Sequence, residues 1–228
     1  MSLFYYCNQI ENDKAFFDAH EVGHLKVMKK KEGEEVSFTD GMGNVYSGFI
    51  TSLKKNEAII QIIKKAEDLS RELTKHIEIT AGLSSWSRLS IMIEKAVELG
   101  VQRINLVNCE YSNYHKVNLE KVEKAARKAL KQCGGTIMPV IDSLESPKES
   151  FREGIVPVLL NPRAKQHINT MSFPQKTNIF IGPEGGFTEK ELDEIRAISN
   201  ETLDITLGNR ILRLETAAIV VIGYISLK

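Results

Sequence analysis

The 228-residue sequence contains few cysteines and no long apolar run. Its three cysteines, Cys7, Cys109 and Cys133, are odd in number, lie far apart and form no CxxC pair, so neither a disulfide framework nor a zinc site is indicated. Each is expected to be a small buried residue in a protein of the reducing cytosol. No apolar run reaches the length of a membrane span, and the N-terminus lacks the basic and apolar regions of a signal peptide. These absences predict a cytoplasmic protein without a membrane partner.

The sequence also lacks an excess of charge of either sign, because 30 Lys and Arg residues balance 30 Asp and Glu residues. Proteins that neutralise many phosphates usually carry a basic excess, so composition alone does not indicate a nucleic-acid partner. Short basic clusters at residues 29–31, 54–55 and 64–65 fit an RNA-binding surface and an ordinary solvated face equally well. His20 and His24 are spaced as metal ligands on a helix would be, but no third ligand is evident, so no metal site is expected.

The two common phosphate-binding loops, GxGxxG and GxxxxGK[ST], are missing, which removes support for dinucleotide-binding and P-loop mechanisms. The chain has instead two strand–glycine turn–helix units near its C-terminus. In the first unit, an apolar strand at residues 179–181 enters a turn at residues 182–186. A helix then starts with Thr188 as N-cap and Glu191 three residues later, the pattern of a capping box.

The second unit repeats this design with a strand at residues 203–207, a turn at residues 208–209 and a helix that begins near Glu215. Two such units place their turns at the C-terminal edge of an α/β sheet, where these folds bind ligands. Glycine turns let the backbone approach a flat ligand closely. A glycine-rich connection without any ligand is the alternative.

The two units also carry a family resemblance. GPEGGFTEKEL at residues 182–192, followed by LGNRILRLETA at residues 207–217, resembles the signature of the RsmE family, the 16S rRNA (uracil-N3) methyltransferases of the SPOUT superfamily. The resemblance implies an α/β domain with a trefoil-knotted parallel sheet and helices on both faces, preceded by a small PUA-like β-barrel. It also implies S-adenosylmethionine (SAM) as cofactor, 16S rRNA within the 30S subunit as substrate, and no metal.

The residue pattern divides the chain in a way that agrees with this implication. Short strands with tight turns are predicted at residues 36–39, 45–53 and 58–63, which favours a small antiparallel barrel. Residues 64–72 are charged and have no apolar period, so we place the domain boundary there. The expected domains are residues 1–70, an RNA-binding barrel, and residues 73–228, the methyltransferase domain.

Beyond the boundary, strands and helices alternate as a parallel α/β sheet requires. One apolar helical face includes Leu89 and Val97 and is closed by Gly100, and a second runs from Leu119 to Cys133. Strands are predicted at residues 76–81, 101–107, 136–141 and 155–160.

The resemblance places the cofactor against the backbone of three loops. The residues that it implies for cofactor binding are Leu160, Asn161, Gly182, Pro183, Glu184, Gly185, Gly186, Leu207, Gly208, Ile211, Leu212, Leu214 and Thr216.

The chemistry of uracil indicates which charged residues matter. The N3 proton has a pKa about two units above neutral, so methylation needs a base near N3 or cations that stabilise the negative charge spreading onto O2 and O4. Arg210 and Arg213 lie in the second signature loop and suit the cationic role. Glu184 and Glu215 are carboxylates that can act as base or hold an arginine. Alternatively, Arg213 and Glu215 form only a structural pair.

The RNA-facing half departs from the family pattern. Residues 24–30 loosely resemble the family's His-Leu-x-x-Val-Leu-Arg stretch, which implies RNA contacts for His24, Lys26, Lys29 and Lys30. Arg88 ends a stretch that replaces a Lys-Gly-Asp-Lys-like run. Tyr111 and Gly135 stand where the family has arginines.

The final helix is apolar nearly all round, so it is expected to be buried on most sides. The resemblance to SPOUT enzymes, which generally pair through helices bordering the cofactor site, implies that a second subunit in a homodimer covers part of it. Three functions stay open: methylation of a 16S rRNA uridine at N3, methylation of a different RNA site, and non-catalytic RNA binding or ribosome assembly with the same fold.

Overall fold

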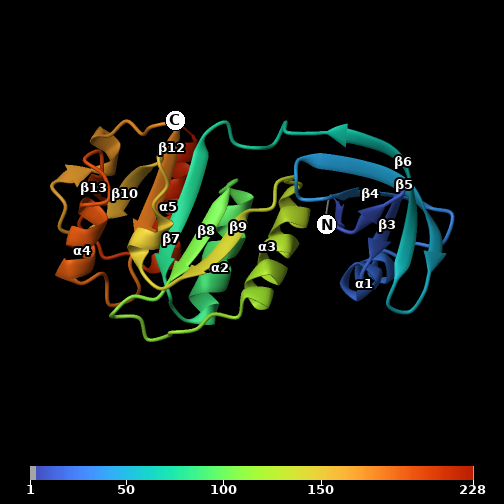
Figure 1. Cartoon of the computed structure of the whole chain (residues 1–228), viewed down its shortest axis with the longest axis horizontal. Coiled ribbons are helices and arrows are strands. Elements are labelled where there is room, and N and C mark those ends of the chain that lie inside the picture. The colour runs from blue at the N-terminus through green and yellow to red at the C-terminus, as the bar shows by residue number, and fades with distance from the viewer. Residues whose placement is uncertain (1–3, 228) are drawn as a thin grey trace. The chain divides into compact units, whose positions relative to one another are not determined.

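The computed structural model describes residues 4–227 and is shown in Figure 1. Its contacts divide the chain into two compact units. Unit 1 consists of Met1–Glu72 and Arg127–Met138, and unit 2 consists of Leu73–Ala126 and Pro139–Lys228. The chain therefore returns to unit 1 once, through the last turns of one helix and the segment after it.

Unit 1 is built on a six-stranded sheet in the order β1-β4-β5-β6-β3-β2. Neighbouring strands are antiparallel except β1 and β4, which are parallel. The core side chains Phe17, Phe38, Ile50 and Ile60 are fully buried. The strands are β1 (Tyr5–Tyr6), β2 (Ile10–Glu11), β3 (Lys14–Phe17), β4 (Glu35–Thr39), β5 (Asn44–Leu53) and β6 (Ala58–Glu67). The three strands predicted for this part of the chain are confirmed.

Two features of unit 1 correct the sequence-based expectations. The predicted strand at residues 58–63 ended too early, because β6 continues to Glu67 and its exposed, charged residues still pair with β5. A strand whose side chains are exposed has no apolar alternation to reveal it. The all-β prediction also missed helix α1 (Ala19–Val27), which Asp18 caps by accepting a hydrogen bond from the Glu21 backbone N–H at 2.9 Å.

The second segment of unit 1 explains another correction. Helix α3 (Leu119–Cys133) has the predicted range, and the chain after it is bonded to the turn between β4 and β5 and to residues 68–72 of unit 1. The Thr136 and Ile137 backbone N–H groups donate to Oε1 of Glu72 at 2.6 and 3.2 Å, and Ile137 bridges to Met42. The strand predicted at residues 136–141 therefore starts only at Val140, because the residues before it are bonded within unit 1.

Unit 2 is an all-parallel sheet in the order β11-β13-β10-β12-β7-β8-β9. Its central strands are buried, and Ile77, Ile79, Ile104 and Phe180 have no exposed surface. The strands are β7 (His76–Gly82), β8 (Arg103–Val107), β9 (Val140–Leu144), β10 (Val156–Leu160), β11 (Gln166–His167), β12 (Lys176–Ile181) and β13 (Leu203–Thr206). Apart from β9, which both starts and ends later than the predicted residues 136–141, the strands predicted for this half are confirmed.

The helices of unit 2 are α2 (Trp86–Glu98), α4 (Glu189–Arg196) and α5 (Leu214–Ser226), with a 3-10 turn η1 (Pro147–Ser150) that contacts α4. Gly100 ends α2 with φ +79°, as predicted. Helix α2 connects β7 to β8 in one direction along the sheet, and α4 connects β12 to β13 in the other. Right-handed crossovers therefore place α2 and α4 on opposite faces. Helix α5 packs against α2, β7 and β12. The trefoil knot implied by the resemblance stays a prediction.

Candidate functional site

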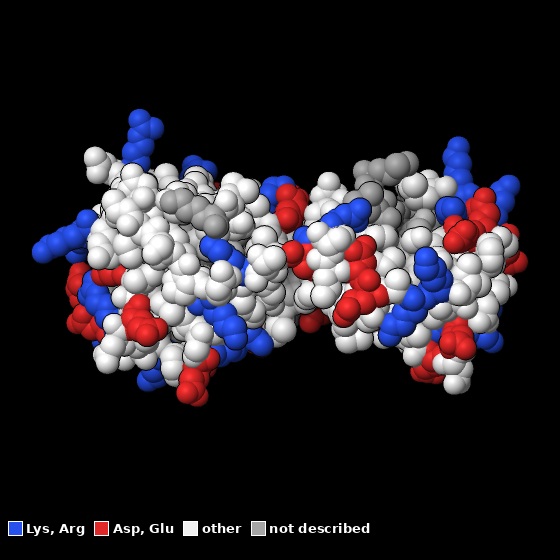
Figure 2. Space-filling view, turned by 90° about the horizontal axis from the view of Figure 1, so that it is seen from above, with Lys and Arg blue, Asp and Glu red and all other residues white. Residues whose placement is uncertain are grey.

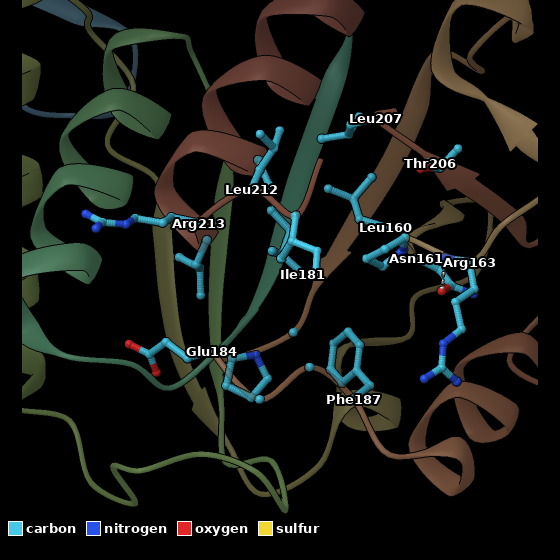
Figure 3. Close-up of a pocket in the computed structure, with 18 of the residues that line it drawn as sticks. Leu160, Asn161, Arg163, Ile181, Glu184, Phe187, Thr206, Leu207, Leu212 and Arg213 are labelled. Carbon is cyan, nitrogen blue, oxygen red and sulfur yellow. Dashed lines mark hydrogen bonds between the residues drawn. The ribbon is translucent and has the colours of Figure 1, made fainter. Parts of the chain in front are cut away.

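A cleft of about 610 Å³ opens at the C-terminal ends of β10, β12 and β13 in unit 2. Three loops form most of its lining, namely residues 160–163, 181–189 and 205–214. These are the loops that follow three neighbouring parallel strands, so the sheet order itself brings together segments about twenty-five residues apart. Figure 3 shows Leu160, Ile181, Leu207 and Leu212 gathered around the centre of this cleft.

The loop after β12 is a turn with little room for side chains. Gly186 has φ +75° and its N–H donates to the Pro183 carbonyl at 2.9 Å. A Cβ on Gly182 would lie 3.0 Å from the Gly186 backbone, and a Cβ on Gly82, at the end of β7, would lie 2.4 Å from Pro183. These glycines let the turn fold onto itself and onto β7, which leaves bare backbone along the cleft.

The predicted capping box closes this turn. Thr188 Oγ1 accepts from the Glu191 N–H at 3.2 Å, and Glu191 Oε2 accepts from the Thr188 N–H at 2.8 Å. The other Glu191 oxygen accepts from the Glu110 backbone N–H at 3.0 Å. One glutamate thus starts α4 and also fastens the loop after β8 beside the cleft.

The loop after β10 is held by Asn161, which is almost fully buried. Its backbone N–H donates to the Ile205 carbonyl at 2.9 Å, and its Oδ1 accepts from the Arg163 N–H at 2.9 Å. The Arg163 guanidinium then pairs with Glu189 at 3.0 Å, and Figure 3 shows this side chain at the Asn161 side of the cleft. Asn161 therefore contributes to the cleft by fixing the conformation of the loop after β10.

The loop after β13 supplies apolar surface and free cations. Gly208 has φ +123°, and Thr206 Oγ1 accepts from its N–H at 3.2 Å, which fixes the turn. Ile211 is 89% exposed at the cleft, an unusual position for an apolar side chain. Arg210 and Arg213 are exposed, line the cleft, and form no ion pair with any residue between 4 and 227.

Glu184 is the best-held charged group of the cleft. The Ser84 hydroxyl donates to Glu184 Oε1 at 2.6 Å, and Arg88 Nη1 lies 3.1 Å from the same oxygen. Ser84 and Arg88 come from the segment that begins α2, so two neighbouring strands of the sheet, β7 and β12, deliver the parts of this cluster. Figure 3 shows Glu184 and Arg213 on the side of the cleft opposite Arg163.

Glu215 lies elsewhere. It is 8% exposed in the first turn of α5, is not part of the cleft lining, and its Oε2 has no hydrogen-bond partner in the described chain. No ion pair joins it to Arg213 within the described residues, so the purely structural pair considered as an alternative is not formed. Thr216 is exposed and is also outside the lining.

The cleft brings together every other residue of the expected cofactor set, and it contains residues that the sequence analysis did not assign to it. Ile181 and Ile205 lie at the C-terminal ends of predicted strands, so their place in the site could have been predicted. Arg88 and Tyr111 lie in segments where the sequence differs from the family pattern, so the resemblance did not assign them to the site. The added lining residues are Arg88, Tyr111, Pro162, Arg163, Ile181, Phe187, Thr188, Glu189, Leu192, Ile205, Thr206 and Ala217.

The residues expected to contact RNA lie in unit 1, on α1 or just after it. Lys26 Nζ donates to the Lys55 carbonyl and Lys30 Nζ to the Glu35 carbonyl, both at 2.9 Å. His24 is less accessible, since the centroid of its ring lies 4.7 Å from that of the Tyr5 ring. Burial in turn lowers the pKa of its imidazole. Figure 2 shows Lys and Arg intermixed with Asp and Glu on the face in view, in keeping with the zero net charge.

The cysteines are not placed for chemistry. Cys7 and Cys109 are buried as predicted, whereas Cys133 is half-buried. Burial raises the pKa of the Cys7 thiol to about 11 and that of Cys109 to about 12, so both are protonated near neutral pH and are poor nucleophiles. Among the described residues, no cluster of three or more His, Cys, Asp or Glu side chains could hold a metal, and no helix is long and apolar enough to cross a membrane.

Comparison with known proteins decides the family. A family model described as an RNA methyltransferase domain matches residues 71–226, and one described as an RNA methyltransferase PUA domain matches residues 17–63. Ribosomal RNA small subunit methyltransferase E of Mesomycoplasma hyopneumoniae is 31% identical over 179 residues, which cover 75% of this chain and 78% of the relative. The chain belongs to this methyltransferase E family. The resemblance found in the two signature units is confirmed.

Further relatives and solved structures extend the match. The Rickettsia conorii protein is 26% identical and covers 91% of this chain and 87% of its own length. A predicted RNA methyltransferase from Thermotoga maritima has a structure with a TM-score of 0.81 at 33% identity, covering 98% of this chain and 97% of the other. The methyltransferase E of Neisseria gonorrhoeae, solved with SAM bound, has the same fold, with a TM-score of 0.85 at 23% identity and coverage of 98% and 96%.

Proposed function

We propose that this protein is a SAM-dependent methyltransferase that methylates N3 of one uridine in the 16S rRNA of the small ribosomal subunit. The observation that carries the proposal is the cleft at the strand ends, where both signature loops meet in a chain of the methyltransferase E family. Acting on the ribosome would place the protein in the cytoplasm.

The cleft suits SAM in size and in chemistry. Its volume of about 610 Å³ is typical of small-molecule sites. The bare backbone of residues 182–186 can approach a flat adenine, and Leu160, Leu207 and Leu212 supply apolar contact. When bound, SAM would supply a methyl group on a positively charged sulfonium. The chain's own task is then to orient uracil and to manage the N3 proton.

Arg213 and Arg210 are suited to stabilise the charge that develops on uracil. Deprotonation at N3 spreads negative charge onto O2 and O4, and a guanidinium keeps its charge at every physiological pH. Both side chains lie at the cleft without an ion-pair partner among the described residues, so neither has to give up an existing contact to meet the base.

Glu184 is the carboxylate best placed to take the N3 proton. It lines the cleft, whereas Glu215 is buried outside it. Ser84 and Arg88 both bind Oε1, which orients the carboxylate and leaves Oε2 available. Accepting the proton at Oε2 breaks the N3–H bond and leaves its electron pair on the uracil ring. Glu215 then has a supporting role at the start of α5.

Unit 1 and α5 carry the surfaces that would bind the two proposed partners, RNA and a second subunit. His24, Lys26, Lys29 and Lys30 lie on or directly after α1, where the three lysines offer unit 1 a cationic edge for the RNA backbone and the neutral His24 ring lies beside them. On α5, Ile219 and Val220 are 36% and 42% exposed, an apolar stripe that a second subunit of a homodimer would cover.

Mass mapping of rRNA tests the proposed function. Purified protein is incubated with unmethylated 30S subunits and SAM, beside Arg213→Ala and the exposed control Lys148→Ala. We expect one methyl group on a uracil base, lost in Arg213→Ala and kept in Lys148→Ala. SAM binding by calorimetry without transfer to rRNA would redirect the proposal to another RNA, and absence of both transfer and SAM binding would favour a non-catalytic RNA-binding protein.

A further inference from the structure

A large aromatic side chain stands exposed at the cleft without a role in the steps above. Tyr111 follows β8 in a tight turn, lines the cleft together with Arg88 and Glu184, and keeps 52% of its surface exposed. No described residue forms a hydrogen bond with its hydroxyl. Because Tyr111 is part of the lining of the cleft, its exposed ring is accessible to a ligand that enters the cleft.

The position of Tyr111 is fixed by contacts on both sides in the sequence. The Ser112 N–H donates to the Cys109 carbonyl at 3.0 Å, and Ser112 Oγ accepts from the Cys109 N–H at 3.2 Å. Glu110 donates its backbone N–H to Glu191 at 3.0 Å. The turn that carries Tyr111 is therefore fastened to the capping box of α4.

A third anchor joins Tyr111 to the glycine loop of the cleft. A Cβ built on Gly185 would lie 2.7 Å from the Tyr111 Cβ and 3.4 Å from its Cγ. The absence of a side chain at residue 185 thus allows Tyr111 to lie directly on the loop. Gly185 does not have a positive φ, so close approach is the reason for glycine here.

We propose that Tyr111 is a substrate-positioning residue whose ring stacks on the target base of the RNA. This inference rests on the proposed function. A base that reacts at a ring nitrogen of its pairing edge must leave its pair and its stack, and enzymes of this kind hold such a base between aromatic or apolar side chains. The exposed ring on this anchored turn replaces the lost stacking partner, while the Glu184 carboxylate and the Arg213 guanidinium meet the polar edge.

The test uses the full-length chain and three substitutions. Tyr111→Phe keeps the ring, Tyr111→Leu keeps apolar bulk without a π face, and Tyr114→Ala removes a neighbouring exposed tyrosine that does not line the cleft. For each, kcat and KM for 30S subunits are measured, with the Kd for SAM by calorimetry. The Kd for a short uridine-containing single-stranded RNA is measured in the presence of S-adenosylhomocysteine, which prevents turnover.

We expect Tyr111→Leu to lower kcat/KM roughly 10- to 100-fold and to weaken RNA binding, as loss of one base–aromatic stack does. Tyr111→Phe and Tyr114→Ala should stay within about twofold of wild type, and SAM affinity should be unchanged throughout. Equal losses of kcat/KM in Tyr111→Phe and Tyr111→Leu would assign the effect to the hydroxyl. A parallel loss of SAM affinity would show that Tyr111 contacts the cofactor. Either result overturns the inference, as does an unchanged Leu variant.

The measurement of RNA binding distinguishes a failure of this inference from a failure of the proposed function. If wild type transfers no methyl group but Tyr111→Leu alone weakens RNA binding, the stacking role stands and the proposed reaction fails. If transfer to rRNA is normal in Tyr111→Leu, the reaction stands and the stacking role fails. Tyr111→Trp supplies a second variant in case Leu perturbs folding, and it should bind RNA at least as well as wild type.

Discussion

Arg88 and Glu184 form an ion pair at one side of the cleft, with Nη1 of the arginine 3.1 Å from Oε1 of the glutamate. Their side chains keep 30% and 23% of their surface exposed, so the pair adds little to the stability of the fold. Its effect is on geometry, because Ser84 binds the same oxygen at 2.6 Å and the two donors together hold that oxygen in place. The pair is therefore best understood as orienting Glu184 for its work on the substrate.

Removing the arginine should slow the reaction without loss of fold. We expect Arg88→Ala to lower kcat on the order of 10- to 100-fold, since Glu184 loses one of two orienting donors and the cleft loses a cation. Arg88→Lys should recover part of the loss, because lysine keeps the charge without the planar fork. Steady-state methylation of 30S subunits measures kcat for both variants. An Arg88→Ala enzyme with wild-type kcat would show that Glu184 needs no such support.

The contrast between Thr188 and Arg88 shows what the sequence could reveal. The capping box of Thr188 and Glu191 is local, so both the helix start and the turn before it were predictable from spacing. Arg88 pairs with a residue 96 positions away, and only the strand order brings the two together. Helix α1 was missed for a related reason: its buried face includes Glu21, whose partner Lys131 lies 110 residues along the chain.

Gly82 should be intolerant of a side chain for steric reasons. A Cβ at this position would lie 2.5 Å from the backbone N of Pro183, and backbone cannot rotate away as a side chain can. We expect Gly82→Ala to lower the free energy of unfolding by about 1–3 kcal/mol and to weaken SAM binding, because the loop it displaces lines the cleft.

Gly223 offers the matched control for this experiment. It lies in α5 and a Cβ there meets nothing within 4 Å, so Gly223→Ala should leave SAM binding unchanged and raise stability by up to about 1 kcal/mol. Urea unfolding and calorimetry report the two quantities. Equal stability and equal SAM affinity in both variants would contradict the close packing of β7 on the glycine loop.

The buried ion pair between Lys131 and Glu21 should be costly to break. Their side chains are 3% and 1% exposed and lie 2.6 Å apart. Lys131→Met leaves Glu21 buried without its counter-charge, so we expect a loss of about 3–5 kcal/mol in urea unfolding. The double variant Glu21→Leu, Lys131→Met should recover most of it, whereas Lys128→Met, at an exposed position of the same helix, should be near neutral. If Lys131→Met were as stable to urea as the double variant, the result would contradict a buried ion pair.

Acid should destabilise the protein in part through His24. Burial lowers its pKa from the usual 6.5, with Lys131 adding to the effect and Glu21 opposing it. The unfolded chain therefore binds a proton at a higher pH than the folded chain, and stability from this residue is present above pH 6.5 and is lost as pH falls through the folded pKa.

His24→Gln removes this titration and should flatten the fall in urea midpoint between pH 7.5 and pH 5.5. His20→Gln provides the control, because His20 lies on the same helix with 52% of its side chain exposed. If the two variants lose stability with the same pH slope as wild type, His24 is not a source of the acid sensitivity. A flatter slope in His24→Gln alone would show that the burial of its ring disfavours the charged form.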